Sequence, residues 1–105
     1  MLITNTEVVA NKEIKETLGL VKGNTIKARH IGSDIGASLK NLVGGEVKGY
    51  TKMISEAREE AVERMIKEAE RVEADAIVNV RFSTSQVMQG AAEILAYGTA
   101  VKLKS

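Results

Sequence analysis

The chain contains neither cysteine nor proline, and only three of its 105 residues are aromatic. Without cysteine it can form neither a disulfide framework nor a thiolate metal site. The aromatic residues Tyr50, Phe82 and Tyr97 are too few for the stacking surface that single-stranded nucleic acids need. Because no proline marks the ends of helices and strands, their boundaries are read from glycine, asparagine and changes in apolar spacing.

An excess of one charge and a long apolar run are also missing. Fifteen Lys and Arg face fourteen Asp and Glu, a formal net charge of +1, so we expect no binding to nucleic acid or to a membrane surface. No apolar run approaches the roughly 20 residues of a membrane span, and the N-terminus lacks the pattern of a signal peptide. We therefore expect a cytoplasmic protein, with a single domain over residues 1–105.

The first half of the chain is punctuated by glycine. The residues Ile14 to Val21 and Thr25 to Ala28 predict two short strands around a tight turn at Gly23 and Asn24. A short helix is expected next, capped by Ser33 or Asp34 and ended by Gly44 and Gly45. Its apolar positions fall on one face of a helix: Ile35, Leu39, Leu42 and Val43.

The longest regular pattern runs from about Thr51 to Val72 and predicts a helix. Its apolar residues form one wide stripe: Ile54, Ala57, Ala61, Val62, Met65, Ile66, Ala69 and Val72. The alanines would let this helix lie close to a sheet. On the opposite side Glu60 precedes Arg64 by four positions, as Glu63 precedes Lys67, which indicates a solvated face with its own ion pairs.

The apolar period changes to two after Asp75, which predicts a strand with Ala76, Val78, Val80 and Phe82 on one side. A turn at Met88 to Gly90 precedes the closing strand, Ile94 to Leu103. Both sides of this strand are largely apolar: Leu95, Tyr97, Thr99, Val101 and Leu103 on one, and Ile94, Ala96, Gly98 and Ala100 on the other. Such a strand is covered on both sides. One long helix covers one side, so we expect a second copy of the chain to cover the other.

Candidate ligand-binding residues are sparse. His30 and Asp34 are four apart, but two ligands of one chain are too few for a metal site. An oligomer could still bring several copies of His30, Asp34 or Glu46 together around a symmetry axis. The segment from Gly44 to Thr51 resembles a phosphate-binding loop, with Gly44, Gly45 and Gly49 as its glycines, but Tyr50 stands at the lysine position. This loop is the alternative site, for an anion or a small enzyme's substrate.

The sequence also offers no recognisable set of catalytic residues. The single histidine has no serine or threonine partner that the sequence places beside it, so no catalytic triad is expected. Glu73 and Asp75, two apart at a helix-to-strand corner, are interpreted as solvated. We expect a protein that is not an enzyme.

Short motifs spread over most of the chain resemble the YbjQ-like family, which is labelled a heavy-metal-binding domain. They are Asn41-Leu42-Val43-Gly44-Gly45, Tyr50, Ala57-Arg58 with Ala61, Ala74-Asp75-Ala76-Ile77-Val78, and Gly98-Thr99-Ala100-Val101. The resemblance implies a β-α-β-β subunit of dodecin-like type, in which an antiparallel sheet packs on one long helix. It also implies extra short N-terminal strands that join subunits into a ring, typically a pentamer, and no established enzymatic activity.

This chain departs from the family pattern at two positions. Leu18 stands where some members carry cysteine, and Glu73 stands where glycine is common before the Ala-Asp-Ala corner. The first departure removes a soft metal ligand, and the second suggests a different corner. Our hypothesis is a homo-oligomeric binding domain for a divalent metal ion or another small ligand. The alternatives are the anion or enzyme function of the Gly44 to Thr51 loop, and a structural scaffold.

Overall fold

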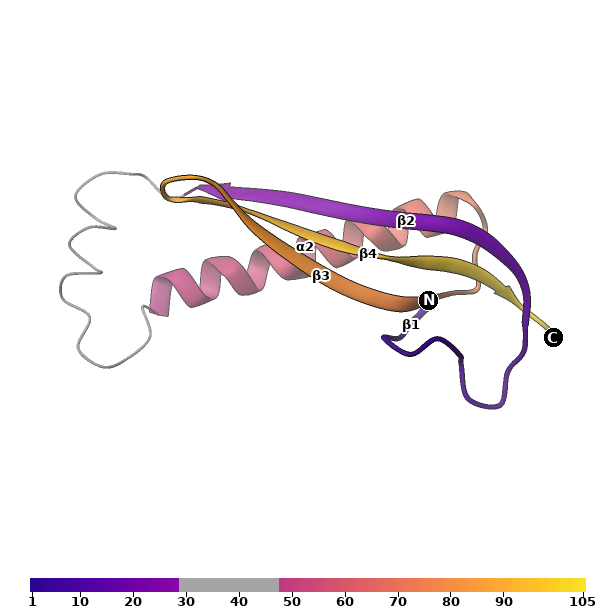
Figure 1. Ribbon diagram of the computed structural model, residues 1–105. Coiled ribbons are helices and arrows are strands. Elements are labelled where there is room, and N and C mark those ends of the chain that lie inside the picture. Colours follow the sequence, from indigo (N-terminus) through magenta and orange to yellow (C-terminus); the bar gives the residue numbers. More distant parts are fainter. Residues whose placement is uncertain (29–47) are drawn as a thin grey trace.

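The chain folds into a sheet with one long helix along one of its faces, as the computed structural model shows (Figure 1). The structure describes residues 1–28 and 48–105, with side chains in the second range from residue 51 onward. Its elements are β1 (Leu2–Ile3), β2 (Ile14–Ala28), α2 (Lys48–Arg71), β3 (Ala76–Met88) and β4 (Ala91–Leu103). The sheet order is β1-β3-β4-β2.

This arrangement confirms the predicted α+β architecture. The three long strands are antiparallel, and the short β1 pairs in parallel with the start of β3. The predicted long helix and the turn before the closing strand are both present. The short helix expected before Gly44 lies outside the described residues. Within the described residues, no helix combines the length and the apolar character that crossing a membrane requires.

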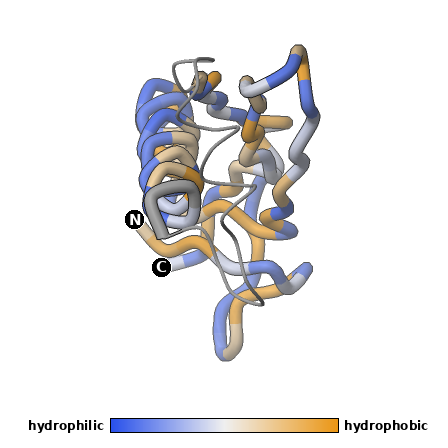
Figure 2. Tube along the Cα trace, turned by 90° about the vertical axis from the view of Figure 1, so that its left-hand side faces the viewer, coloured by the Kyte–Doolittle hydropathy of each residue, from blue (hydrophilic) through white to orange (hydrophobic). Residues whose placement is uncertain are grey.

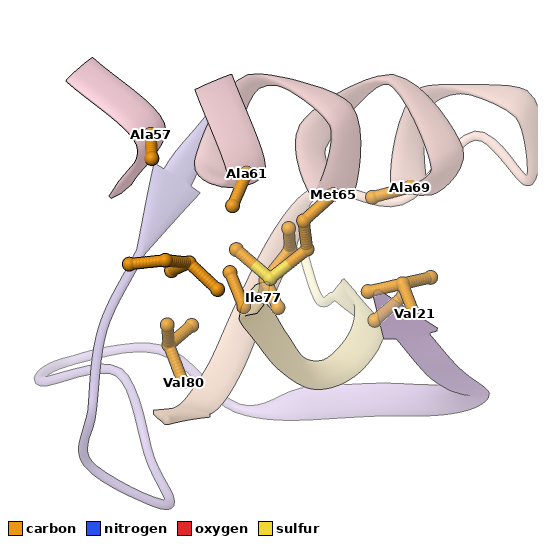
Figure 3. Packing of buried hydrophobic residues seen from close by; sticks show 10 residues of the cluster. Val21, Ala57, Ala61, Met65, Ala69, Ile77 and Val80 are labelled. Carbon is orange, nitrogen blue, oxygen red and sulfur yellow. The ribbon is translucent and has the colours of Figure 1, made fainter. Parts of the chain in front are cut away.

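The helix α2 packs mainly against β2, less against β4, and hardly at all against β3. The predicted stripe makes this contact: Ala57, Ala61, Met65 and Ala69 are completely buried (Figure 3). Figure 2 shows the hydrophilic side of the helix turned away from the sheet. Since three of these four residues are alanines, the helix lies close to the strands, and Met65 is the one large side chain among the four.

β2 and α2 approach each other closely at Gly23. β2 is one continuous strand of 15 residues, so the turn predicted at Gly23 and Asn24 is wrong. A β-carbon at Gly23 would lie 2.3 Å from the carbonyl oxygen of Ala61 and 2.3 Å from the amide nitrogen of Met65. The helix backbone therefore leaves no room for a side chain. Gly23 therefore allows the helix backbone to lie close to the sheet, and it does not form a turn.

The N-terminal segment is attached to an irregular part of β3. The register of β3 against β4 shifts after Val78, and Asn79 has a φ of 55°, a left-handed conformation that asparagine tolerates. The amide of Asn79 donates a 2.9 Å hydrogen bond to the carbonyl of Thr6. Because of this bulge, Val78 and Val80 belong to clusters on opposite faces of the sheet. The prediction that they share one face is therefore wrong.

The helix ends in a hydrogen-bonded reversal of the chain. The amide of Glu73 donates to the carbonyl of Glu70, and the amide of Ala74 donates to the carbonyl of Ala69, each at 3.0 Å. These two bonds define a Schellman motif. Glu73 occupies its left-handed position, with a φ of 59°. Glycine adopts this conformation most easily, so the corner suits the glycine that the family resemblance places there.

Glu73→Gly should therefore stabilise the protein, by up to about 1 kcal/mol, because it removes the left-handed strain of a residue that carries a β-carbon. The measurement is the free energy of unfolding in urea at one fixed protein concentration. Glu73→Ala is the matched control: it removes the same carboxylate but keeps the β-carbon. Equal stability of the glycine and alanine variants would show that the conformation of Glu73 costs nothing.

Charged residues of α2 contact β2 instead of one another. The Lys27 ammonium lies 3.0 Å from a carboxylate oxygen of Glu60. Arg64 donates a 2.5 Å hydrogen bond to the backbone carbonyl of Asn24. The ion pair predicted between Glu60 and Arg64 is therefore wrong, and the two charges instead fasten the outer edge of β2 to the helix.

Candidate functional site

The sheet has a second face, which α2 does not cover. Residues directly opposite each other on paired strands share a face, so the strand register identifies its members. We call the following residues the open face: Leu20, Lys22, Asn24 and Ile26 of β2; Glu93, Leu95, Tyr97 and Thr99 of β4; and Arg81, Ser83 and Ser85 of β3. Alternating burial along β4 confirms that Leu95, Tyr97 and Thr99 share one side of that strand.

The open face mixes accessible apolar side chains with polar and charged ones. Leu20 is 67% exposed and Ile26 is 59% exposed, while Leu95 and Tyr97 between β2 and β3 are half-buried. Between Leu20 and Ile26 on β2, the Asn24 side-chain amide donates a 3.2 Å hydrogen bond to the Glu93 carboxylate of β4. Large apolar side chains gathered on one accessible face are typical of a contact surface.

One end of the same side of the sheet is already covered by the chain itself. Ala76, Val78 and Val101 are buried there in a second, smaller cluster, and Val9 of the N-terminal segment packs against them. Among the described residues, no element covers the remainder in this way. The side of the sheet opposite α2 is therefore divided into a buried end and the open face.

The predicted metal ligands His30, Asp34 and Glu46 lie outside the described residues. Gly44 and Gly45 of the predicted anion loop lie outside them too. The other two loop residues, Gly49 and Tyr50, fall in the first turn of α2. Across residues 1–28 and 51–105, no three His, Asp or Glu side chains gather as a metal site would require.

The acidic corner after α2 has a structural role. A carboxylate oxygen of Asp75 accepts a 2.8 Å hydrogen bond from the amide of Leu103, and the Asp75 amide donates a 2.9 Å bond to the carbonyl of Val101. Asp75 thereby holds the end of β4 to the corner. Leu18, at the position where some members of the resembling family carry cysteine, packs against the helix-side core.

A basic groove beside β2 was missed by the sequence-based reasoning. Lys22 of β2 and Arg64, Lys67 and Arg71 of α2 line it. A signal was present, since residues 64, 67 and 71 are three and four apart and share one side of a helix. Acidic residues one turn earlier had indicated that Arg64 and Lys67 were paired, which concealed the cluster.

Comparison with known proteins agrees with the motifs. The model of the family described as "Putative heavy-metal-binding" matches residues 1–104. UPF0145 proteins of Archaeoglobus fulgidus and Thermosipho africanus are each 61% identical over 104 residues, covering 99% of this chain and 96% of theirs. A UPF0145 protein of Methanosarcina acetivorans is 58% identical over 103 residues, covering 98% of this chain and 97% of its own.

A solved structure shares the fold. It is a protein of unknown function from Pediococcus pentosaceus, assigned to the DUF74 family, and it matches with a TM-score of 0.62 over 99% of this chain and 98% of that chain. At 18% sequence identity this likeness supports the fold alone. The full-length family match and the relatives near 60% identity go further: this chain belongs to the YbjQ family of UPF0145 proteins.

Proposed function

We propose that this protein is a non-enzymatic, homo-oligomeric binding domain whose copies assemble through the open face. The observation that supports the proposal is the apolar character of both sides of β4. Ile94, Ala96 and Ala100 are buried under α2, whereas Leu95 and Tyr97 on the other side remain partly accessible. A strand that is apolar on both sides is stable when both sides are covered.

A second copy of the chain is the partner that this proposal names. Full burial of a leucine or isoleucine side chain is worth about 1.5–3 kcal/mol, so each exposed apolar residue of the open face contributes to association. A chain of this size also builds only a modest core of its own. Closed symmetric homo-oligomers are the common form of soluble assembly. With the family resemblance, we expect the copies to close into a ring, a pentamer.

Leu20→Lys tests the open face directly. Leu20 is already 67% exposed in the single chain, so lysine there should leave the fold intact, yet it places a charge in the proposed contact. We expect the wild type to sediment as a multiple of the 11.3 kDa chain and the variant to shift toward one chain at the same micromolar concentration. Circular dichroism of both proteins checks that the variant is folded.

Val72→Lys is the matched control for this experiment. Val72 is an exposed apolar residue, 45% accessible, that directly follows α2 and lies away from the open face. The control should sediment as the wild type does. The open face would be excluded as the contact surface if the wild type sediments as a single chain. It would also be excluded if both variants dissociate to the same extent.

We place the ligand of this assembly in the class of divalent metal ions or small molecules bound where copies meet. The family description and the predicted ligands His30, Asp34 and Glu46 support the metal version. Calorimetric titration of divalent metals into the assembled protein tests it, with His30→Ala for comparison. If His30→Ala weakens metal binding, a site shared between copies is supported. If no divalent ion produces heat, the proposed metal site is ruled out.

A further inference from the structure

The basic groove is a shallow channel between the outer edge of β2 and the second half of α2. Its lining residues are Lys22, Gly23, Asn24, Arg64, Lys67, Glu68 and Arg71, and its volume is about 220 Å³. Lys22 and Asn24 lie on the edge strand β2, so they belong both to the open face and to this groove. Four cationic side chains and one carboxylate line it, so the charge of the lining is 4 − 1 = +3. The entire chain carries a net charge of only +1, so positive charge is concentrated here.

None of the groove cations forms an ion pair among the described residues, and Glu68 is the one carboxylate in the lining. Glu60, the acid one turn before Arg64, is bound to Lys27. The ion pairs seen in the described residues are Lys27 with Glu60 and Lys104 with Glu13, and neither includes a cation of the groove. A cluster of unpaired cations raises the local concentration of anions.

Arg64 is held in position at the groove. One of its terminal nitrogens donates a 2.5 Å hydrogen bond to the carbonyl of Asn24. A guanidinium has five N–H donors in a fixed fork, so the donors that this bond does not use remain for a ligand. Because the side chain is already tethered to β2, less rotational freedom is lost when an anion binds.

A backbone donor lies beside the cations. The Asn24 carbonyl turns away from β4 to reach Arg64, and the N–H and C=O of one residue in an antiparallel strand point to the same side. The Asn24 amide therefore points along the outer edge of β2. β2 is the last strand of the sheet, so this edge has no strand partner among the described residues.

We propose that the groove binds a small anion that carries one or two phosphoryl groups. Arginine recognises phosphoryl oxygens in pairs, lysine adds point charges, and an outward amide supplies a neutral donor. The volume of about 220 Å³ is below the roughly 300–1,000 Å³ of sites that bury drug-sized ligands, which favours a phosphoryl group over a larger metabolite. The phosphoryl group could be free or part of a nucleotide.

Titration calorimetry with inorganic pyrophosphate, at low ionic strength, tests the proposal. We expect the wild type to bind, and Arg64→Gln and Arg71→Gln each to weaken the affinity by about tenfold or more, because each removes a charge-assisted hydrogen bond. Arg58→Gln is the matched control, since Arg58 is an exposed arginine of the same helix outside the groove. It should leave the affinity unchanged. A parallel titration with ADP distinguishes the sources: equal affinity supports a free phosphoryl ligand, and tighter binding supports a nucleotide.

Failure of this proposal can be told apart from failure of the proposed assembly. The sedimentation of Arg64→Gln is measured beside its calorimetry, and we expect it to match that of the wild type. No binding of pyrophosphate by the wild type, or equal weakening by Arg58→Gln, would overturn the phosphoryl site. No binding together with a loss of assembly in Arg64→Gln would also overturn it, and would assign the groove to contact between copies.

Discussion

Gly23→Ala should destabilise the protein by about 3 kcal/mol, the upper range for overpacking a close contact. The new β-carbon would lie 2.3 Å from two backbone atoms of α2, on Ala61 and Met65, and 2.7 Å from the β-carbon of Arg64. Backbone atoms in the middle of a helix cannot turn aside as a flexible side chain can. The helix must therefore move away from β2, and the core beneath it loses contacts. Urea unfolding at one fixed protein concentration measures the loss.

Gly19→Ala separates this clash from the general cost of replacing a glycine. Gly19 lies in the same strand, but a β-carbon there would meet no atom within 4 Å. Its φ of 116° makes alanine strained, at a cost of about 1–3 kcal/mol. We expect Gly23→Ala to be the more destabilising of the two. A Gly23→Ala variant as stable as the wild type would contradict the close approach of β2 and α2.

Met65→Ala should cost about 2–5 kcal/mol, the usual range for truncating a large buried side chain to alanine. Met65 is completely buried, and its neighbours along the stripe, Ala61 and Ala69, are too small to fill the space it would leave (Figure 3). Ile77 on the sheet side belongs to the same buried cluster, whose packing would be loosened by the truncation. Thermal and urea unfolding both report this loss.

Met88→Ala is the matched control for this truncation. Met88 is 60% exposed at the end of β3, so removing the same atoms should change the stability by less than about 0.5 kcal/mol. The contrast tests whether Met65 belongs to the core. Equal effects of the two truncations would mean that the helix is not packed on the sheet through this residue.

The features that follow from local periodicity could be predicted from the sequence. The apolar stripe of α2 and the two-sided β4 both depend on spacing within one element, and the structure confirms them. The structural role of a glycine, in contrast, cannot be predicted from the residues next to it in the sequence. Whether Gly23 turns the chain or admits a helix depends on Ala61 and Met65, which follow far along the chain. The β3 bulge that separates Val78 from Val80 depends similarly on the N-terminal segment.

Charge pairing could not be predicted for the same reason. Glu60 and Arg64 satisfy the spacing of a helical ion pair, but the partner of Glu60 is Lys27, 33 positions away. Because Lys27 of β2 pairs with Glu60, Arg64 is not bound to Glu60 and lines the groove instead. Of the candidate site, the sequence predicted the apolar side of β4. It did not indicate the basic groove, because that groove exists only when β2 and α2 lie side by side.

The most direct test of the proposed assembly is the accessibility of Tyr97. The chain has no tryptophan, and Tyr50 and Tyr97 are its only tyrosines, so in a Tyr50→Phe background the intrinsic fluorescence reports the open face alone. Acrylamide quenching is compared with and without Leu20→Lys. If a second copy covers the open face, Tyr97 is protected in the Tyr50→Phe protein and is quenched more strongly when Leu20→Lys is added. Equal quenching of the two proteins would contradict assembly through this face.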